Sequence, residues 1–334
     1  MKPSTMQALV FDGEAKLRTD VAVPRPEAGE VLVAVRVAGV CSTDLEILKG
    51  YMDFRGVMGH EFVGEVVGVA AGDRSAKLKK WLHKRVVAEI NCICGRCEMC
   101  RRGLSGHCTD RTVLGIDRRD GAFAEYVTVP AGNLHEVPES VSDDEAVFVE
   151  PLAAAFQVIH QVKIRRDAGV VVLGDGRLGQ LVARVLKAAN RRPLLVGRHA
   201  AKLEAAEKQG IQTALAEEFV ARAEADFVVD ATGSAGGFEL AMRTVRPRGT
   251  IVLKSTFAAQ TPCALGSFAP LVINEITVVG SRCGPFPEAI KALANREVDV
   301  AALLSRRFDL AQATTALRAA KDPDNIKVLI DVRH

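Results

Sequence analysis

The sequence predicts an α/β chain of two domains, a β-rich domain and a domain with a doubly wound parallel sheet. The 334 residues exceed what one ordinary hydrophobic core contains, and this length indicates two domains. Up to about residue 150 the chain shows short alternating apolar runs, interrupted by glycine and proline. Beyond that point, continuous apolar runs alternate with stretches of helical periodicity, which is typical of a parallel sheet with helices on its faces.

The β-rich part is expected to form a small barrel or sandwich, because it consists of many short strands separated by turn residues. These segments show short alternating apolar runs, with glycines and prolines where turns would fall. Strand candidates include MQALVFDG (6–13), EVLVAVRVAGV (30–40) and AFAEYVTVPAG (122–132). The tail after residue 292 differs in composition, and its run KVLIDV (327–332) is expected to return to this first domain.

Residues 151–281 supply the alternating helices and strands of the parallel sheet. A buried parallel strand consists of a continuous apolar run, and VVVLG (170–174) is such a run. Helical periodicity predicts helices over 151–164, 176–190 and 199–210. Further strands are expected at PLLVG (193–197), DFVVDATG (226–233), GTIVLKS (249–255) and ITVVGS (276–281).

Composition and charge argue against several classes of partner. The net charge of +3 is small, and no long basic run is interleaved with aromatic residues, so we expect no nucleic acid partner. No segment approaches the roughly 18 apolar residues of a membrane span, and the opening MKPSTMQALVFDG lacks the apolar core of a signal peptide. Eight cysteines are too few for a disulfide-stapled domain. We therefore expect a cytoplasmic protein with no membrane partner.

Four cysteines stand close together with the spacing C-x2-C-x2-C-x7-C. Thiolates this close in sequence can converge on one tetrahedral ion, which is usually Zn²⁺. A four-sulfur zinc has no open position, so we expect a structural zinc in a lobe at about 90–110, the alternative being an incidental cluster. Cys92 breaks the spacing, and the isolated Cys263 and Cys283 are expected to be buried thiols. The four candidate ligands are Cys94, Cys97, Cys100 and Cys108.

A glycine-rich turn of the pattern G-x-G-x-x-G follows the first strand of the parallel sheet. The pattern alone is weak, but here it directly follows a strand and opens a helix, which is the context of a dinucleotide-binding turn. Its glycines permit a close approach to a pyrophosphate, and the helix N-terminus offers free N–H groups. The alternative is a glycine-rich turn that binds nothing. The candidate cofactor-binding residues are Gly174, Gly176, Arg177, Leu178 and Gly179.

The end of the second strand indicates which dinucleotide binds. An NAD site has an acid about 20 residues past the glycines, where it bonds the ribose hydroxyls. Here the strand ends at Gly197-Arg198-His199 without an acid, and Arg198 can pair with a 2′-phosphate. We therefore predict a preference for NADP, the alternative being that Arg198 is a surface charge and NAD binds. Thr232, after a later strand, is expected near the nicotinamide, although an ordinary turn explains it almost as well.

Three further segments contain possible metal ligands: Cys41-Ser42-Thr43-Asp44, Gly59-His60-Glu61 and Glu150-Pro151-Leu152. With the four-cysteine lobe and the glycine-rich turn, they make the chain resemble the zinc-dependent medium-chain dehydrogenase/reductase family of alcohol dehydrogenases. The likeness spans nearly the whole chain and is closest to the polyol and threonine dehydrogenase branch. It implies a GroES-like catalytic domain (1–153 and 292–334), a Rossmann domain (154–291) and a catalytic zinc in the cleft between them.

The resemblance also implies a metal-binding role for four of these residues. Cys41, His60 and Glu150 match the family's zinc ligands, with Glu150 held directly or through water. Glu61 matches a neighbouring acid that can approach the metal in exchange with water. Three protein ligands leave a fourth position for an alcohol oxygen, whose pKa a bound Zn²⁺ lowers.

Two more residues of the same segments match supporting roles in the reaction. Asp44 matches the acid that orients His60, and Thr43 the hydroxyl that takes the substrate's proton. The implied function is a zinc-dependent alcohol or polyol dehydrogenase that moves a hydride between NAD(P) and a secondary alcohol, or its ketone or aldehyde. The resemblance further implies two zinc ions per chain, a small alcohol or carbonyl substrate, and a homodimer or homotetramer. The alternatives are a zinc-free quinone or enoyl reductase of the same superfamily, and a non-catalytic protein that senses NADP.

Overall fold

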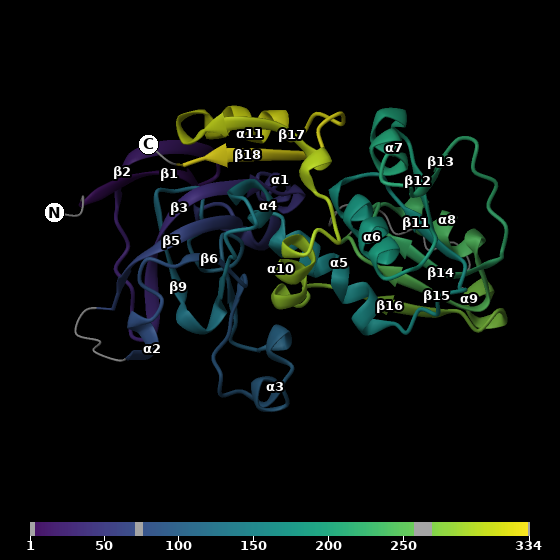
Figure 1. Ribbon diagram of the computed structural model, residues 1–334, viewed down its shortest axis with the longest axis horizontal. Helices are drawn as coiled ribbons and strands as arrows, with labels where there is room; N and C mark the ends of the chain where they lie inside the picture. The colour runs from purple at the N-terminus through teal and green to yellow at the C-terminus, as the bar shows by residue number, and fades with distance from the viewer. Residues whose placement is uncertain (1–3, 71–75, 257–268, 333–334) are drawn as a thin grey trace. The chain divides into compact units, whose positions relative to one another are not determined.

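The computed structural model describes residues 4–70, 76–256 and 269–332, and the chain divides into two compact units. The first unit comprises Met1–Glu150 and Leu304–His334, and the second comprises Pro151–Leu303 (Figure 1). The sequence predicted domain boundaries after residues 153 and 291, whereas the two units divide after residues 150 and 303. The expected fold class is confirmed, since one unit is β-rich and the other contains a parallel sheet.

Two main sheets form the first unit. Its principal strands are β1 (Thr5–Phe11), β2 (Ala15–Ala22), β3 (Glu30–Val40), β4 (Gly56–Val57), β5 (Glu61–Val69), β6 (Arg85–Ala88), β9 (Tyr126–Pro130), β10 (Leu134–Glu136), β17 (Leu304–Asp309) and β18 (Lys327–Asp331). The smaller sheet has three strands in the order β2-β1-β4. The larger has seven, in the order β10-β6-β5-β3-β18-β17, and β9 also pairs with β3.

The C-terminal strand β18 completes the larger sheet by pairing antiparallel with β3. Val328 is opposite Val40, and Leu329 is opposite Gly39. The first four residues of β18 are buried, because the strand lies inside the sheet, between β3 and β17. The tail therefore returns to the first unit, and it lies beside the strand that leads to Cys41 (Figure 1).

Short helices and one small hairpin connect these strands. The α-helices are α1 (Ser42–Ile47), α2 (Ala76–Lys79), α3 (Glu98–Arg101), α4 (Asp143–Ala146) and α11 (Ala313–Ala319), and the 3-10 helices are η1 (Tyr51–Asp53), η2 (Ser105–His107), η3 (Ala131–Asn133) and η5 (Leu310–Gln312). Strands β7 (Asn91–Cys92) and β8 (Thr112–Val113) pair antiparallel and enclose the loop that contains the four clustered cysteines.

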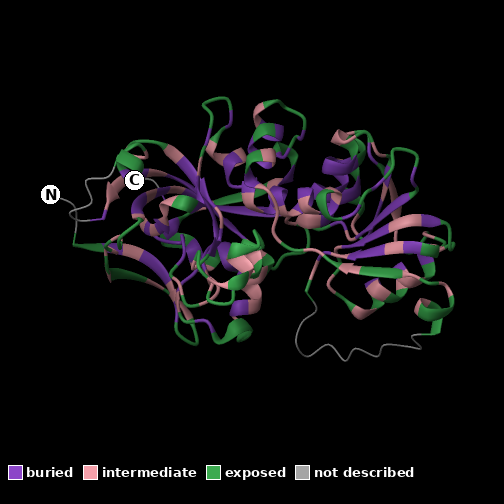
Figure 2. Ribbon diagram, turned by 90° about the horizontal axis from the view of Figure 1, so that it is seen from below, coloured by how far each residue is buried: buried purple, intermediate pink, exposed green. Residues whose placement is uncertain are grey.

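The second unit is a six-stranded parallel sheet with helices between most of its strands. The strands are β11 (Val170–Leu173), β12 (Pro193–Gly197), β13 (Gln212–Leu215), β14 (Ala225–Asp230), β15 (Val245–Leu253) and β16 (Thr277–Gly280). The helices are α5 (Val149–Gln161), α6 (Arg177–Ala188), α7 (Ala200–Glu207), α8 (Ala235–Thr244), α9 (Ala269–Ile273), α10 (Phe286–Ala294) and η4 (Ala301–Leu303). All four residues of β11 are buried, as its continuous apolar sequence predicts. Buried stretches, drawn purple, run along strands of this sheet (Figure 2).

The strand order predicts a ligand-binding position next to β11. The order is β13-β12-β11-β14-β15-β16, so the chain reverses its direction across the sheet between β11 and β14. Open parallel sheets bind ligands outside the carboxyl ends of their strands at such a reversal. The glycine-rich turn follows β11 and therefore lies at this position.

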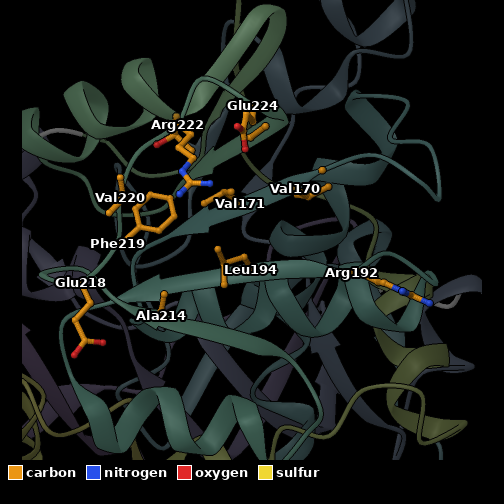
Figure 3. Close-up of a pocket in the computed structure, with 13 residues that line it drawn as sticks. Val170, Val171, Arg192, Leu194, Ala214, Glu218, Phe219, Val220, Arg222 and Glu224 are labelled. Carbon is orange, nitrogen blue, oxygen red and sulfur yellow. The ribbon is translucent and has the colours of Figure 1, made fainter.

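The connection from β13 to β14, residues 216–224, consists of turns and irregular backbone and includes no helix. It leaves an open pocket of about 610 Å³ whose lining includes Val171, Leu194 and Ala214 from the sheet. Phe219 and Arg222 extend into it from the connecting segment (Figure 3). The pocket's charged side chains are spread out, with Glu218 and Arg192 at opposite ends (Figure 3).

No helix within the described ranges is long and apolar enough to cross a membrane. Cys283 is half-buried, not fully buried as expected, and Cys263 lies outside the described residues.

Candidate active site and metal centres

The antiparallel pairing of β3 with β5 brings Cys41 beside His60 and Glu61. Gly39, two residues before Cys41, is opposite Glu61, the first residue of β5. The sulfur of Cys41, a ring nitrogen of His60 and a carboxylate oxygen of Glu61 all lie within 4.8 Å of one another. His60 and Glu61 are buried, and Cys41 is half-buried. The structure thus brings together three residues that the sequence assigned to one site.

Gly59 turns the chain into β5 directly before His60. Its φ is +94°, a backbone conformation that residues with a Cβ rarely adopt. A Cβ at this position would also lie 2.4 Å from Cδ1 of Phe123. Backbone conformation and lack of space therefore both require a glycine at this position. The turn at Gly59 sets the direction from which His60 enters the site.

Asp44 connects the Cys41 loop with His60. One carboxylate oxygen of Asp44 accepts the backbone N–H of Cys41 at 2.8 Å, and the other lies 3.4 Å from Nδ1 of His60. Burial alone would lower the pKa of His60, but the negative charges of Asp44 and Cys41 outweigh it and raise this pKa well above its ordinary value. The same negative charge favours a cation at the point where Cys41, His60 and Glu61 converge.

Lys327 is a site residue that the sequence did not reveal. Its ammonium forms an ion pair with the carboxylate of Glu61, and both side chains are completely buried. Burial lowers the pKa of Lys327 to about 8, although the charges of Cys41 and Asp44 oppose the shift. Since 266 positions separate Lys327 from Glu61, no local motif could have linked them.

Thr43 and Glu150 occupy different positions relative to this cluster. The hydroxyl of Thr43 lies 3.6 Å from the sulfur of Cys41, so it is beside the candidate metal ligands. Glu150 is half-buried in the first turn of α5, and its carboxylate is outside the group of converging ligand atoms. A metal-binding role for Glu150 therefore stays a prediction.

The four clustered cysteines form a second candidate metal centre in the β7–β8 loop. Their sulfur atoms all lie within 4.8 Å of one another, with Cys97–Cys100 and Cys94–Cys108 separations of 3.5 Å each. Backbone N–H groups point at two of the sulfurs. The N–H of Cys94 donates to the sulfur of Cys108, and that of Cys97 donates to the sulfur of Cys94, each at 3.4 Å.

The thiols of this cluster differ strongly in acidity. Hydrogen bonds from the backbone at Cys100 and Thr109 lower the pKa of Cys97 to about 6. Partial burial and the neighbouring thiols of Cys97 and Cys108 raise the pKa of Cys100 to about 12. Four thiolates this close repel one another unless a cation shares their charge, so the geometry fits a tetrahedral metal ion.

The glycine-rich turn has the shape that a dinucleotide-binding turn requires. Gly174 follows β11 with φ +105°, and a Cβ at Gly179 would lie 1.8 Å from the carbonyl oxygen of Gly174. Gly176 is the N-cap of α6, while Arg177 and Leu178 are the first two residues of that helix. The N-terminal N–H groups of α6 therefore lie at the carboxyl end of β11, where a pyrophosphate binds in such folds.

Two neighbouring strand ends carry polar groups beside this turn. Arg198 is exposed after Gly197, the last residue of β12. After β14, the backbone N–H and the hydroxyl of Thr232 donate to one oxygen of Asp230 at 2.9 and 2.7 Å. Burial raises the pKa of Asp230, although the bonds from Thr232 oppose the shift. Asp175, inside the glycine-rich turn, reaches the end of β12, which the sequence did not indicate.

Comparison with known proteins gives matches to both parts of the chain. The alcohol dehydrogenase GroES-like domain matches residues 27–139, and the zinc-binding dehydrogenase family matches residues 178–297. D-altritol 5-dehydrogenase of Agrobacterium fabrum is 32% identical over 90% of this chain and 91% of its own length. Sorbitol dehydrogenase of Halalkalibacterium halodurans is 29% identical over 92% of this chain and 93% of its own.

Solved structures share the fold over nearly the whole chain. The alcohol dehydrogenase RspB of Escherichia coli CFT073, in complex with NADH, has a TM-score of 0.88 and 26% identity over 99% of this chain and 100% of its own. A protein of Sinorhizobium meliloti 1021 assigned to the zinc-binding dehydrogenases, bound to NADP, has a TM-score of 0.89 and 27% identity over the same shares. The expected GroES-like and Rossmann folds are therefore confirmed. The chain belongs to the zinc-type medium-chain alcohol dehydrogenase family.

Proposed function

We propose that this chain is a zinc-dependent dehydrogenase that moves a hydride between NADP and a secondary alcohol or polyol, or the matching ketone or aldehyde. One observation carries the proposal: a thiol, an imidazole and a carboxylate, from Cys41, His60 and Glu61, converge in a largely buried site. Mixed nitrogen, sulfur and oxygen donors of this kind are typical of catalytic zinc. Two of the relatives are named for polyols, altritol and sorbitol, which supports the substrate class.

The residues at this site fit a divalent metal ion. The donor types suit zinc, and the negative charge that raises the pKa of His60 favours a cation. We propose Glu150 as a further ligand, directly or through water, because it matches the family's third ligand position. Zn²⁺ held there supplies Lewis-acid polarisation of the substrate's oxygen and lowers that oxygen's pKa.

The neighbouring side chains orient the ligands and move the substrate's proton. Asp44 holds the Cys41 backbone and faces Nδ1 of His60, which keeps the imidazole in one orientation. The hydroxyl of Thr43, 3.6 Å from the Cys41 sulfur, is proposed to accept the proton of an alcohol while it releases its own proton towards solvent. Hydride loss from the alcohol carbon is easier once that proton has left, because negative charge on the oxygen favours the departure of hydride.

The four-cysteine centre is proposed to hold a second, structural zinc. Four sulfur donors fill a tetrahedral coordination shell and leave no position for a substrate. This zinc would stabilise the β7–β8 loop, whose ligands are Cys94, Cys97, Cys100 and Cys108.

The cofactor is proposed to bind at the carboxyl ends of β11, β12 and β14. Gly174, Gly176 and Gly179 leave room for the pyrophosphate, and the start of α6, at Arg177 and Leu178, supplies N–H groups. Thr232 would face the nicotinamide half. The two similar solved structures hold NADH and NADP, so they support a dinucleotide without choosing between them.

We propose NADP as the preferred cofactor. Gly197 at the end of β12 has no carboxylate of its own to bond a ribose diol, and the exposed Arg198 can pair with a 2′-phosphate. We further propose that the chain works in the cytoplasm as a homodimer or homotetramer. Its free, clustered cysteines suit a reducing compartment, and light scattering of the purified protein would give the oligomeric state.

The experiment that tests this function follows cofactor absorbance with a panel of secondary alcohols, polyols, amino alcohols and ketones. We expect turnover with at least one of them, a higher kcat/KM for NADP than for NAD, and loss of turnover after chelation and in Cys41→Ser. Undiminished turnover in Cys41→Ser would contradict the zinc mechanism and favour a zinc-free reductase. Tight NADP binding with no turnover of any substrate would favour a dinucleotide sensor.

A further inference from the structure

The carboxylate of Asp175 lies at the end of β12, although Asp175 itself belongs to the turn after β11. One of its oxygens accepts the backbone N–H groups of Arg198 and His199, both at 2.7 Å. The imidazole Nδ1 of His199 lies 3.0 Å from the same oxygen and 3.1 Å from the other. The side chain of Asp175 is only 8% exposed. It therefore ties the glycine-rich turn to the segment that follows β12.

Gly197 makes room for this contact. A Cβ at residue 197 would lie 2.4 Å from the Cβ of Asp175 and 2.5 Å from its Oδ2. The Asp175 side chain thus fills the space that a side chain at the end of β12 would otherwise occupy. An acid at position 197 would clash with Asp175. This clash explains why a glycine ends the strand.

The contact holds the backbone of residues 198 and 199 and orients the His199 ring. Because Nδ1 of His199 is engaged by the carboxylate, Nε2 is the ring nitrogen left for another partner, and the side chain is 28% exposed. Arg198 is exposed and forms no ion pair within the part of the chain that the structure describes. An exposed arginine and a partly exposed histidine therefore follow each other at the end of β12.

We infer that Asp175 is a positioning residue for cofactor selectivity, holding Arg198 and His199 as the binding site for the 2′-phosphate of NADP. The inference rests on the proposed function, because it assigns a part of the dinucleotide site. Arg198 supplies a charge-assisted pair with the phosphate. One proton shared between Nε2 of His199 and a phosphate oxygen, carried by either group, supplies a second bond.

The negative charge of Asp175 is compatible with a phosphate at this position. The carboxylate is buried and receives two backbone N–H groups and one imidazole nitrogen, so its charge is offset locally. Arg198 is exposed and the side chain of His199 is 28% exposed, so a phosphate can reach both from solvent. A ribose diol makes no charged contact with these groups, so their removal affects NADP far more than NAD.

The test is fluorescence titration of the purified full chain with NADPH and, separately, with NADH. We expect His199→Ala to weaken NADPH binding about tenfold or more, because one charge-assisted hydrogen bond is lost. NADH binding should stay nearly unchanged. Asp175→Asn should change the ratio of the two affinities in the same direction, because the amide cannot accept all three donors. The ³¹P signal of the bound 2′-phosphate should also shift in both variants, which a merely structural role for Asp175 would not produce.

Asp226→Asn is the matched control. Asp226 is another carboxylate of the second unit that accepts a backbone N–H, from Gly169 at 2.8 Å, but it is remote from β12 in the strand register. Its substitution should leave the NADPH-to-NADH ratio unchanged. An unchanged ratio in His199→Ala, or a ratio that rises toward NADPH in Asp175→Asn, would overturn the inference. The second result would show that the carboxylate bonds the ribose hydroxyls. If the wild-type chain bound neither dinucleotide, the proposed function itself would fail.

Discussion

Lys327 and Glu61 form a completely buried ion pair that joins the last strand of the chain to the candidate metal site. β18 supplies Lys327, and β5 begins at Glu61, with β3 between the two strands. Removing one partner of a buried pair leaves the other as an uncompensated buried charge. We therefore expect Lys327→Met to lower the free energy of unfolding by about 3–5 kcal/mol, measured by urea denaturation.

A double variant controls for this prediction. Combining Lys327→Met with Glu61→Gln removes both charges, so part of the lost stability should return. If Lys327→Met unfolded at the same midpoint urea concentration as the wild type, Glu61 would not be charged and paired in solution.

Gly39 provides the space that Lys327 occupies. A Cβ at Gly39 would lie 2.3 Å from Nζ of Lys327 and 2.6 Å from Cγ1 of Val147. Gly39→Ala should therefore cost about 1–3 kcal/mol of stability through overpacking. Gly132→Ala is the control, because a Cβ there meets nothing within 4 Å. Equal thermal midpoints for the two variants would contradict the packing described here.

Thr43 offers a test of proton transfer that does not disturb the metal ligands. Thr43→Val keeps the shape of the side chain and removes the hydroxyl, so kcat should fall about 10²–10⁴-fold, as for the loss of a general acid–base group. Thr43→Ser should retain most of the activity, and zinc content should stay at the wild-type value in both variants. Similar kcat values for Thr43→Val and the wild type would remove Thr43 from the mechanism.

Asp226 gives a prediction for the dependence of stability on pH. Burial favours the neutral acid, but bonds from Arg246 and the Gly169 backbone outweigh it and lower the pKa of Asp226 below its ordinary value of 3.8. A lowered pKa contributes stability above pH 3.8 that is lost as pH falls through the folded-state value. Asp226→Asn should therefore cost about 1 kcal/mol at neutral pH and progressively less below about pH 4. A constant difference in unfolding free energy between pH 7 and pH 3 would contradict this reasoning.

The sequence was most informative where the interacting residues are close together along the chain. The four cysteines span 15 positions, from Cys94 to Cys108, and the glycine-rich turn spans six, so spacing alone predicts that their atoms converge. The turn also has the predicted context, since it follows β11 and opens α6. Cys41 and His60 were linked only through resemblance to a family, because their proximity depends on the pairing of β3 with β5.

Two site residues could not be predicted from the sequence, for different physical reasons. Lys327 approaches Glu61 only because β18 pairs with β3, a contact between opposite ends of the chain. Asp175 stands at a variable position of the glycine-rich motif, and the direction of its side chain depends on the backbone of that turn. The end of β12 was therefore interpreted as lacking an acid, whereas a carboxylate reaches it from the neighbouring turn.

Zinc content per chain, compared among wild type, Cys41→Ser and Cys97→Ser, tests the central claim most directly. We predict about two zinc ions in the wild type, and in Cys41→Ser about one, with the thermal midpoint nearly retained and hydride transfer lost. Cys97→Ser should lose the other zinc and unfold at a lower temperature. A wild-type chain with a single zinc that is lost in Cys97→Ser, together with full activity in Cys41→Ser, would contradict the assignment of catalysis to Cys41 and His60.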